Sequence, residues 1–475
     1  MVALSKEILE FAASSDPDQT LMKHIAAAAA AAVQRSDEIG ADRPINLLLA
    51  GYFGAGNVGS DMRANEIVRQ ISYLLGDDMV TYSALALTDR MPSDVLGAVK
   101  CLPVDDYVPK ALSRAVFDHD GVIACEGSMF KSKFSNVLSA VMAGALGIAS
   151  RSGKLSIGYG AEVAAMDNSL SSFVSEHASG ALIMCRNEAS RRAADAIGLR
   201  ATPGADTAWT FDAAPKEKAA AMLRKLGWNG SDEIVTICPS NPFWWPVRAN
   251  PVMALEMQKT GRHRELSYGS VFFHAESDEI AGKYNRYIQN LAFAMNELRR
   301  RMNAFPLLVG MERVDEVACR DLAERMDGDP VILMGYQHPV RDVVGLLRLS
   351  SVLISSRFHA LVGAMPGCVR SIGIAIDERV QNLLGDADQS GRIVAPDDDA
   401  LGDKIIEIAL AMDADDVARA SAKTVGDAVV SIGEMGIAFT DEIIKTCPDF
   451  PVPSRPRTWE SHIPPLPHAI SELLN

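Results

Sequence analysis

An arginine and a histidine stand two residues apart where an apolar run ends, in the segment Ser355-Ser356-Arg357-Phe358-His359-Ala360. The run before it, residues 351–354, reads as a buried strand. Ligands of α/β proteins bind beyond the carboxyl ends of parallel strands. Arg357 is a permanent cation with a planar donor fork, and His359 can move a proton near neutral pH. The pair predicts an anionic substrate that gains or loses a proton. The alternative is structural, with Arg357 at a helix start and His359 in the core.

A glycine-rich turn follows the first expected strand, with the sequence Gly54-Ala55-Gly56-Asn57-Val58-Gly59. Glycines let a backbone approach a ligand, and free N–H groups at a helix start attract anions. The spacing matches an NAD-binding pattern, but that pattern needs an acid near the end of the second strand. Asp77 and Asp78 come before that strand and Asp89 comes late. An anion-binding turn and a tight turn without a ligand stay open.

Two other expected strands of the first half end in polar residues. Glu126 and Ser128 follow the strand at 121–125, where a half-buried carboxyl could act as acid or base. Arg186 follows the strand at 181–185, and a structural salt bridge is its alternative role. Trp244 and Trp245 lie in a proline-bounded loop. We expect them to pack locally, with a stacking platform for a sugar as the alternative.

Strands and helices alternate in two series, which predicts two parallel α/β domains facing a cleft. The turn-rich segment Asn229–Asp232 separates the series. We expect a helical extension at 1–43, Rossmann-like domains at 44–228 and 229–400, and a helical, proline-rich extension at 401–475. The expected strands are 45–50, 80–87, 121–125, 155–159 and 181–185, then 234–238, 271–274, 306–309, 331–334, 351–354 and 371–375.

Composition excludes several classes of protein. A length of 475 residues suits two domains, and a net charge of -15 argues against a nucleic-acid partner. The seven cysteines include no C-x-x-C pair, and no clustered metal ligands stand out, so we expect no metal and a reducing compartment. The alanine run at 26–32 is too short to span a bilayer. We expect a cytoplasmic protein, free or peripheral to the inner face of the membrane, and a homo-oligomer stays open.

Taken in order, these segments resemble the polysaccharide pyruvyl transferase family. The stretches Gly51–Gly59 and Ser156–Gly160 look like its first glycine turn and its mid-domain strand, and Ser356–Ala360 looks like its S-R-x-H-A signature. The resemblance covers roughly residues 45–390. It implies two Rossmann-like halves of the glycosyltransferase-B type. It also implies transfer of a pyruvyl group from phosphoenolpyruvate to a sugar or glycolipid precursor, often as a ketal.

The resemblance also implies roles for single residues. Arg357 and His359 would serve donor binding and catalysis, with Arg186 as a further donor-binding arginine. The chain has Arg379 where the family usually carries lysine, which keeps the charge and changes the geometry. Phosphoenolpyruvate would be the co-substrate, with no further cofactor; His359 would carry the proton, and Glu126 would accept the acceptor's proton. The substrate-binding set is Arg357, Arg186, Arg379, Gly54, Gly56, Asn57 and Ser128. A glycosyltransferase with a nucleotide-sugar donor and a non-catalytic family member are the alternatives.

Overall fold

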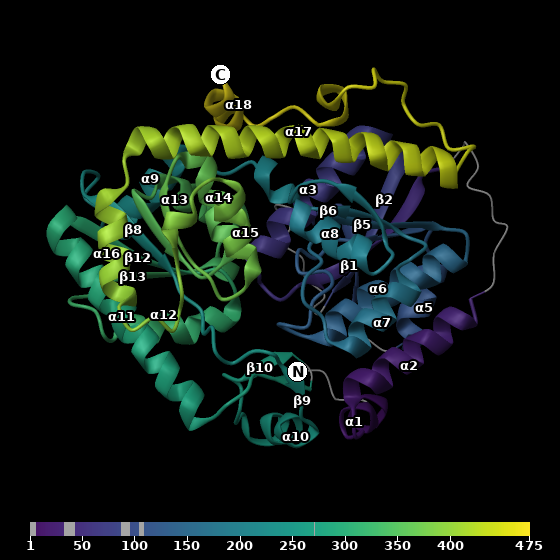
Figure 1. Ribbon diagram of the computed structural model, residues 1–475, viewed down its shortest axis with the longest axis horizontal. Coiled ribbons are helices and arrows are strands. Elements are labelled where there is room, and N and C mark those ends of the chain that lie inside the picture. The colour runs from purple at the N-terminus through teal and green to yellow at the C-terminus, as the bar shows by residue number, and fades with distance from the viewer. Residues whose placement is uncertain (1–5, 33–42, 87–95, 104–108, 270) are drawn as a thin grey trace.

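A computed structural model describes residues 6–32, 43–86, 96–103, 109–269 and 271–475. Two parallel α/β domains lie side by side beneath one long helix (Figure 1). The predicted fold class is confirmed, with a Rossmann-like sheet in each half, helices before the first sheet and a proline-rich segment after the last long helix. The end of the strand expected at 80–87, parts of the extension at 1–43 and the acid Asp89 lie outside the described residues.

The N-terminal sheet has seven parallel strands in the order β3-β2-β1-β4-β5-β6-β7. Its central strands are buried apolar runs, as is typical of a parallel sheet covered on both faces. The two edge strands were not predicted, because they are short, and β7 has no buried residue. The strands are β1 Ile45–Phe53, β2 Val80–Ala86, β3 Val99–Pro103, β4 Gly121–Ala124, β5 Leu155–Ala161, β6 Leu182–Cys185 and β7 Arg200–Pro203.

Helices cover both faces of this sheet. Residues 26–30 of the alanine run lie in α2, which packs against the apolar helix α6. A Cβ atom added at Gly144 of α6 would lie 2.1 Å from Ile25 of α2, so small residues allow this close contact. The helices are α1 Lys6–Ala12, α2 Pro17–Ala30, α3 Val58–Leu75, α5 Pro109–Phe117, α6 Asn136–Arg151, α7 Asn168–His177 and α8 Glu188–Ala196.

The C-terminal sheet has six parallel strands in the order β13-β12-β8-β14-β15-β16. These strands are β8 Glu233–Cys238, β12 Ala304–Gly310, β13 Val331–Met334, β14 Val352–Ser355, β15 Arg370–Ile374 and β16 Ile393–Val394. The helices of this half are α9 Lys216–Lys225, α11 Asp278–Met302, α12 Glu316–Ala323, α13 Val340–Leu349, α14 Phe358–Ala364, α15 Glu378–Asp386 and α16 Leu401–Ala411.

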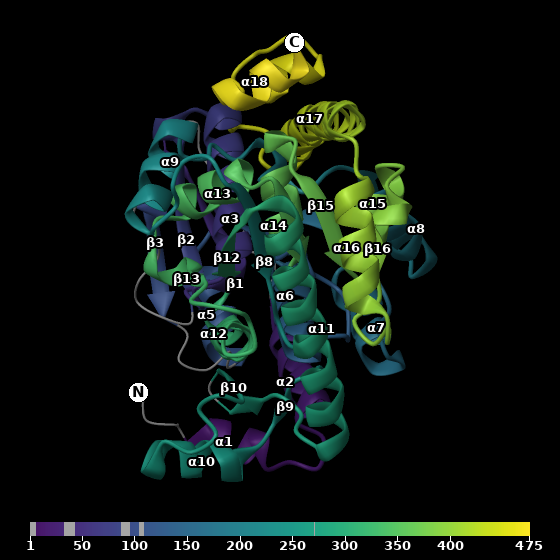
Figure 2. The ribbon, with the colours of Figure 1, turned by 90° about the vertical axis from the view of Figure 1, so that its left-hand side faces the viewer.

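The strand expected at 271–274 does not belong to the C-terminal parallel sheet. Residues Phe272–Phe273 form β11 of a small antiparallel sheet with β9 Arg248–Ala249 and β10 Ser267–Gly269, joined by α10 Pro251–Thr260. We call residues 241–274 the insert. It packs on α1 through a small core that includes Ala12, Ala254 and Phe273. Figures 1 and 2 place it at the end of the molecule opposite the long helix. The sequence pattern of a two-residue strand is too short to predict which sheet the strand joins.

The long helix, α17 Ala414–Thr446, joins the two domains at the other end (Figure 1). Val425, Val429 and Ile432 in its middle part belong to a core formed mostly by the C-terminal domain. Met435 and Phe439 in its second half belong to a core of the N-terminal domain. The proline-rich segment then returns along α17 and ends in α18, His468–Leu474.

Aromatic rings join the insert to the N-terminal domain. Tyr268 stacks on Tyr52 at 5.4 Å between ring centroids, and Trp245 meets Phe134 edge-on at 4.9 Å. Trp244 lies flat against His274 at 3.9 Å. These contacts agree with the local-packing interpretation of the two tryptophans. Burial, aided by Arg357, lowers the pKa of His274 to about 3.

We predict that Phe439→Ala lowers the free energy of unfolding by about 3–5 kcal/mol, because it removes a fully buried ring that packs against Tyr159. Denaturant unfolding measures the change. Ile444→Ala on the same helix is the matched control, since Ile444 is 54% exposed, and its effect should stay within about 0.5 kcal/mol. Equal effects of the two substitutions would show that α17 does not pack as described.

We predict that acid destabilises the protein through His274. Unfolded histidine has a pKa near 6.5, so between that pH and about 3 the unfolded chain binds a proton that the folded chain lacks. The free energy of unfolding therefore falls as the pH falls, by about 1.4 kcal/mol per pH unit for one proton. Denaturant unfolding between about pH 7 and pH 5 should give a shallower slope for His274→Phe. The exposed His468→Phe serves as control, and an unchanged slope in the His274 variant would contradict the assignment.

Candidate functional site

The site lies where the carboxyl ends of the two sheets face each other. The N–H of Val58, at the start of α3 after β1, donates to the carbonyl oxygen of Met311 after β12 at 2.9 Å. Gly56 packs against Tyr336, and a Cβ atom added at Gly59 would lie 2.2 Å from Nδ1 of His359. The turn after β1 and the start of α3 therefore touch two loops and one helix of the other domain. Each sheet reverses its strand order beside its first strand, which is where α/β proteins bind ligands.

His359 meets Asp206 across the two domains. His359 lies in the first turn of α14, and its Nε2 is 3.4 Å from Oδ2 of Asp206, which follows β7. Burial would raise the pKa of Asp206, but Arg63, His359 and Arg186 hold it well below its usual range. Burial lowers the pKa of His359, although Asp206 opposes that shift. An ionised Asp206 therefore faces a neutral imidazole at neutral pH.

Arg63 is a buried residue of this site that the sequence analysis missed. It lies on α3 with no exposed surface and donates to Asp206 at 2.6 Å. It also donates to the carbonyl oxygens of Tyr159 at 2.9 Å and Gly160 at 3.0 Å, at the end of β5. A single arginine on an amphipathic helix normally indicates a solvated face, so the sequence carried no signal for this position.

Arg186 is held by two buried carboxylates and an aromatic ring. It forms ion pairs with Glu162 and, at 3.3 Å, with Asp206. Its guanidinium lies 4.3 Å from the ring centroid of Phe358, in the C-terminal domain. Burial lowers the pKa of Arg186 to about 10. These contacts fit the salt-bridged alternative for Arg186 and bring it to the same carboxylate as His359.

Arg357 is paired inside its own domain. Its Nε lies 3.0 Å from both carboxylate oxygens of Asp315, and its Nη1 lies 2.9 Å from Glu312. Burial raises the pKa of Asp315 to about 6, although Arg357 opposes the shift. Asp315 and Glu312 follow β12, a strand whose end was predicted without a functional role. The structure thus places a carboxylate pair where the sequence analysis expected an open cation.

Arg379 and Ser128 meet across the cleft, at a distance of 3.0 Å from Nη1 to Oγ. Arg379 also donates to Asp377 at 2.8 Å, and Lys131 forms ion pairs with Asp377 at 3.0 Å and Glu378 at 2.9 Å. The start of α15 is therefore tied to the loop after β4. Lys131 is a second cation that the sequence analysis missed.

The remaining predicted residues have structural roles in the turn after β1 and the loop after β4. Glu126 accepts a hydrogen bond from Ser60 Oγ at 3.0 Å. Asn57 caps α3 by accepting from Ser60 N at 3.1 Å. Gly54 and Gly56 have φ values of 77° and 71°, which favour glycine. A tight turn explains these residues without a ligand, and their role in substrate binding stays a prediction.

Carboxylates outnumber cations among these side chains. The cations are Arg63, Lys131, Arg186, Arg357 and Arg379, and the carboxylates are Glu126, Glu162, Asp206, Glu312, Asp315, Asp377 and Glu378. Each of the three arginines predicted to bind phosphoenolpyruvate is paired with at least one carboxylate. A small, doubly anionic donor would have to displace those carboxylates to reach them.

No family model and no curated protein matches the chain. Solved structures do share its fold. A putative UDP-N-acetylglucosamine 2-epimerase from Listeria monocytogenes has a TM-score of 0.52 and 10% identity, over 86% of this chain and 100% of that one. Anabaena HepE in complex with UDP-glucose gives 0.53 and 11%, over 84% and 100%. An α,α-trehalose 6-phosphate synthase from Burkholderia multivorans gives 0.50 and 8%, over 86% and 99%. The glycosyltransferase-B-like arrangement is therefore confirmed.

The predicted membership in the polysaccharide pyruvyl transferase family is wrong. No family model supports it, and the solved structures of like fold are named for UDP-sugar epimerisation, UDP-glucose binding and trehalose 6-phosphate synthesis. The predicted enzyme type, a ketal pyruvyltransferase, is therefore wrong as well. None of these comparisons supports phosphoenolpyruvate as the donor. The paired arginines give a physical reason, because a strand that ends in Ser-Arg-x-His does not by itself leave a free cation. Among the described residues, no helix is long and apolar enough to cross a bilayer.

Proposed function

We propose that the protein is a glycosyltransferase that takes a sugar from a nucleotide-sugar donor. The observation that carries this proposal is the pair formed by His359 and Asp206, at 3.4 Å, between two domains of a glycosyltransferase-B-like fold. The fold supports the donor class, since solved structures of like fold are described with UDP and UDP-sugars. The site supports the chemistry, since a buried, neutral imidazole beside a carboxylate is suited to accept a proton.

The hydrogen-bond roles decide which nitrogen is the base. Ionised Asp206 can only accept hydrogen bonds, so Nε2 of neutral His359 carries the hydrogen and Nδ1 keeps its lone pair. Position 59 faces that nitrogen, and a side chain there would begin 2.2 Å from Nδ1. Any side chain there would clash with the ring, whereas glycine fits and the His359 side chain keeps 11% of its surface exposed. We therefore assign Nδ1 of His359 as the acceptor of the proton, with Asp206 as the residue that positions the ring.

One base is sufficient for the sugar transfer. An acceptor hydroxyl gives its proton to Nδ1 of His359 as its oxygen forms a bond to the anomeric carbon of the donor sugar. The bond between that carbon and the diphosphate oxygen breaks, and the nucleoside diphosphate leaves with the electron pair. A single displacement of this kind inverts the anomeric configuration. The acceptor class that fits is a sugar hydroxyl, as in a glycan or glycolipid precursor.

Arg357 and Arg379 are our candidates to bind the leaving diphosphate. Their side chains are 17% and 16% exposed, whereas those of Arg63 and Arg186 are enclosed. The diphosphate would take over from Asp315 or Asp377 as the partner of one guanidinium. A planar guanidinium can contact two phosphate oxygens at once, which favours this exchange.

We predict that a nucleoside diphosphate raises the thermal midpoint of the protein, because a ligand that binds only the folded state stabilises it by about 2.7 kcal/mol at 100 times its Kd. UDP, GDP, ADP and dTDP are the panel for thermal shift and calorimetry, with phosphoenolpyruvate beside them. Arg379→Met should weaken binding by about tenfold or more, since hydrogen bonds to charged groups contribute about 1.5–3 kcal/mol. Arg301→Met on the exposed surface is the control. Binding of none of the four nucleotides would contradict the proposal.

We predict that His359→Ala lowers kcat by a factor of about 100 to 10,000 while the Kd of the nucleoside diphosphate stays unchanged, because only proton transfer is lost. A donor-hydrolysis or transfer assay with the identified nucleotide-sugar measures the loss. His468→Ala, an exposed histidine on α18, should keep full activity. Conversion of the donor into its epimer, without an acceptor, would assign the protein to epimerisation instead.

A further inference from the structure

We propose that the insert carries a membrane-docking tip, which consists of α10 and the loop after it and binds an anionic lipid surface. The tip is defined by Val252, Leu255, Lys259, Arg262 and Arg264. The proposal stands apart from the proposed function, because neither α10 nor this loop supplies a residue of the His359 site.

The exposed face of α10 is apolar. Val252 is 64% exposed and Leu255 is 37% exposed, and residues three apart lie on the same side of a helix. Only Ala254 of this helix is fully buried, in the small core that the insert shares with α1. One side of α10 is therefore held by the protein, while the opposite side presents branched aliphatic side chains to solvent.

Cations flank this apolar face in the chain. Residues 248–266 contain four of them, Arg248, Lys259, Arg262 and Arg264, against two carboxylates, for a local charge of +2 in a chain of net charge -15. Glu256 pairs with Arg262 and His263, and Glu265 pairs with Arg320. Within the described part of the chain, Lys259 and Arg264 form no ion pair with a carboxylate. Two cations are thus available for lipid phosphates.

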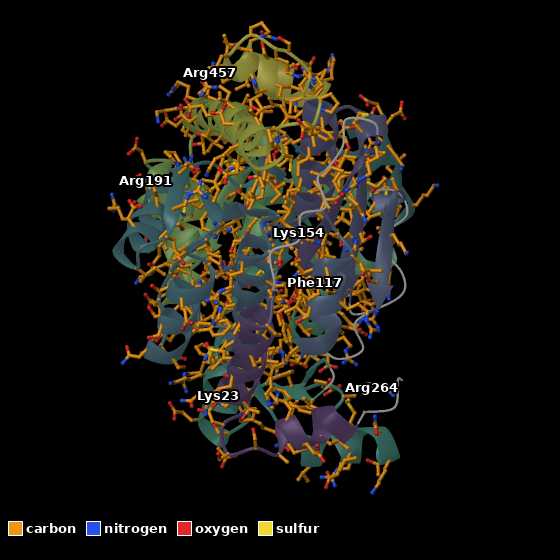
Figure 3. The ribbon with its side chains drawn as sticks, turned by 90° about the vertical axis from the view of Figure 1, so that its right-hand side faces the viewer. Lys23, Phe117, Lys154, Arg191, Arg264 and Arg457 are labelled. Carbon is orange, nitrogen blue, oxygen red and sulfur yellow. The ribbon has the colours of Figure 1, made fainter. Side chains whose placement is uncertain are left out.

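The tip lies at an end of the molecule. Figures 1 and 2 place α10 at the extremity opposite α17. Figure 3 places Arg264 at that end and Arg457 at the other. A flat surface can therefore reach α10 without meeting α17. The same insert also reaches the cleft, because its Tyr268 stacks on Tyr52 at the end of β1.

The size of the apolar face favours a bilayer over a protein partner. Two exposed aliphatic side chains fall far short of the roughly 800 Å² per partner that a stable protein interface buries. Shallow insertion of a short apolar face, together with attraction of cations to anionic headgroups, is sufficient for reversible membrane binding. The overall negative charge of the chain repels the rest of the surface from the same lipids, which orients the protein with α10 toward the membrane.

Vesicle co-sedimentation of the full chain tests this proposal. We expect binding to vesicles that contain about one-third phosphatidylglycerol, little binding to phosphatidylcholine alone, and release by salt near 1 M, where charges are screened within about 3 Å. Lys259→Gln with Arg264→Gln should lower the partition coefficient about 25-fold, at about fivefold per cation. Val252→Ser with Leu255→Ser should lower it by about tenfold or more.

Two controls make the result decisive. Phe293→Ser with Leu410→Ser replaces exposed apolar residues of α11 and α16 and should leave binding unchanged. Unchanged thermal midpoints would show that the tip variants remain folded. Absence of vesicle binding, equal binding by the tip variants and the parent chain, or equal loss in the control variant would overturn the proposal. So would a dimer in light scattering that the Val252→Ser, Leu255→Ser variant abolishes, because a second copy would then occupy the face.

Discussion

The Asp206 carboxylate is the group on which the centre of this structure depends. It is buried between Arg63 of α3, Arg186 after β6 and His359 of α14, so it joins two elements of one domain to a helix of the other. A buried carboxylate is costly unless it is paired, and each of these partners contributes to keeping it ionised. Its ionisation in turn sets the hydrogen on Nε2 of His359. The same contacts of Asp206 therefore join the two domains and set the protonation state of His359.

The two domains are held together at both ends of the molecule. At one end α17 packs its apolar side against both cores. At the other end the insert joins the domains through aromatic contacts and through α1. Between these ends, the cleft is lined by charges paired across it, such as Lys131 with Asp377. A ligand that enters must offer better partners than those carboxylates, which favours a ligand with several anionic oxygens and many further contacts. The nucleotide-sugar donor that we propose meets that requirement better than a small acid does.

The mistaken family assignment has a physical explanation. A glycine turn after the first strand and an S-R-x-H segment after a later strand both occur where strands turn into helices at one edge of a parallel sheet. Gly56 has a positive φ because of that turn, and Gly59 is small because His359 lies against it. The motif residues thus satisfy the packing of a two-domain fold. The donor is decided by which cations stay free, and Arg357 does not stay free, since Asp315 and Glu312 hold it.

The sequence by itself determined the elements. Apolar runs and helical spacing predicted the central strands of both sheets, the helices between them and the end of the strand at which His359 lies. The tertiary structure alone decided the partners: Arg63 and Asp206 are 143 residues apart in the chain, and Asp315 reaches Arg357 from a different strand end. It also decided that residues 271–274 join a small antiparallel sheet. Periodicity is a local property, whereas ion pairs across a cleft depend on how two sheets face each other.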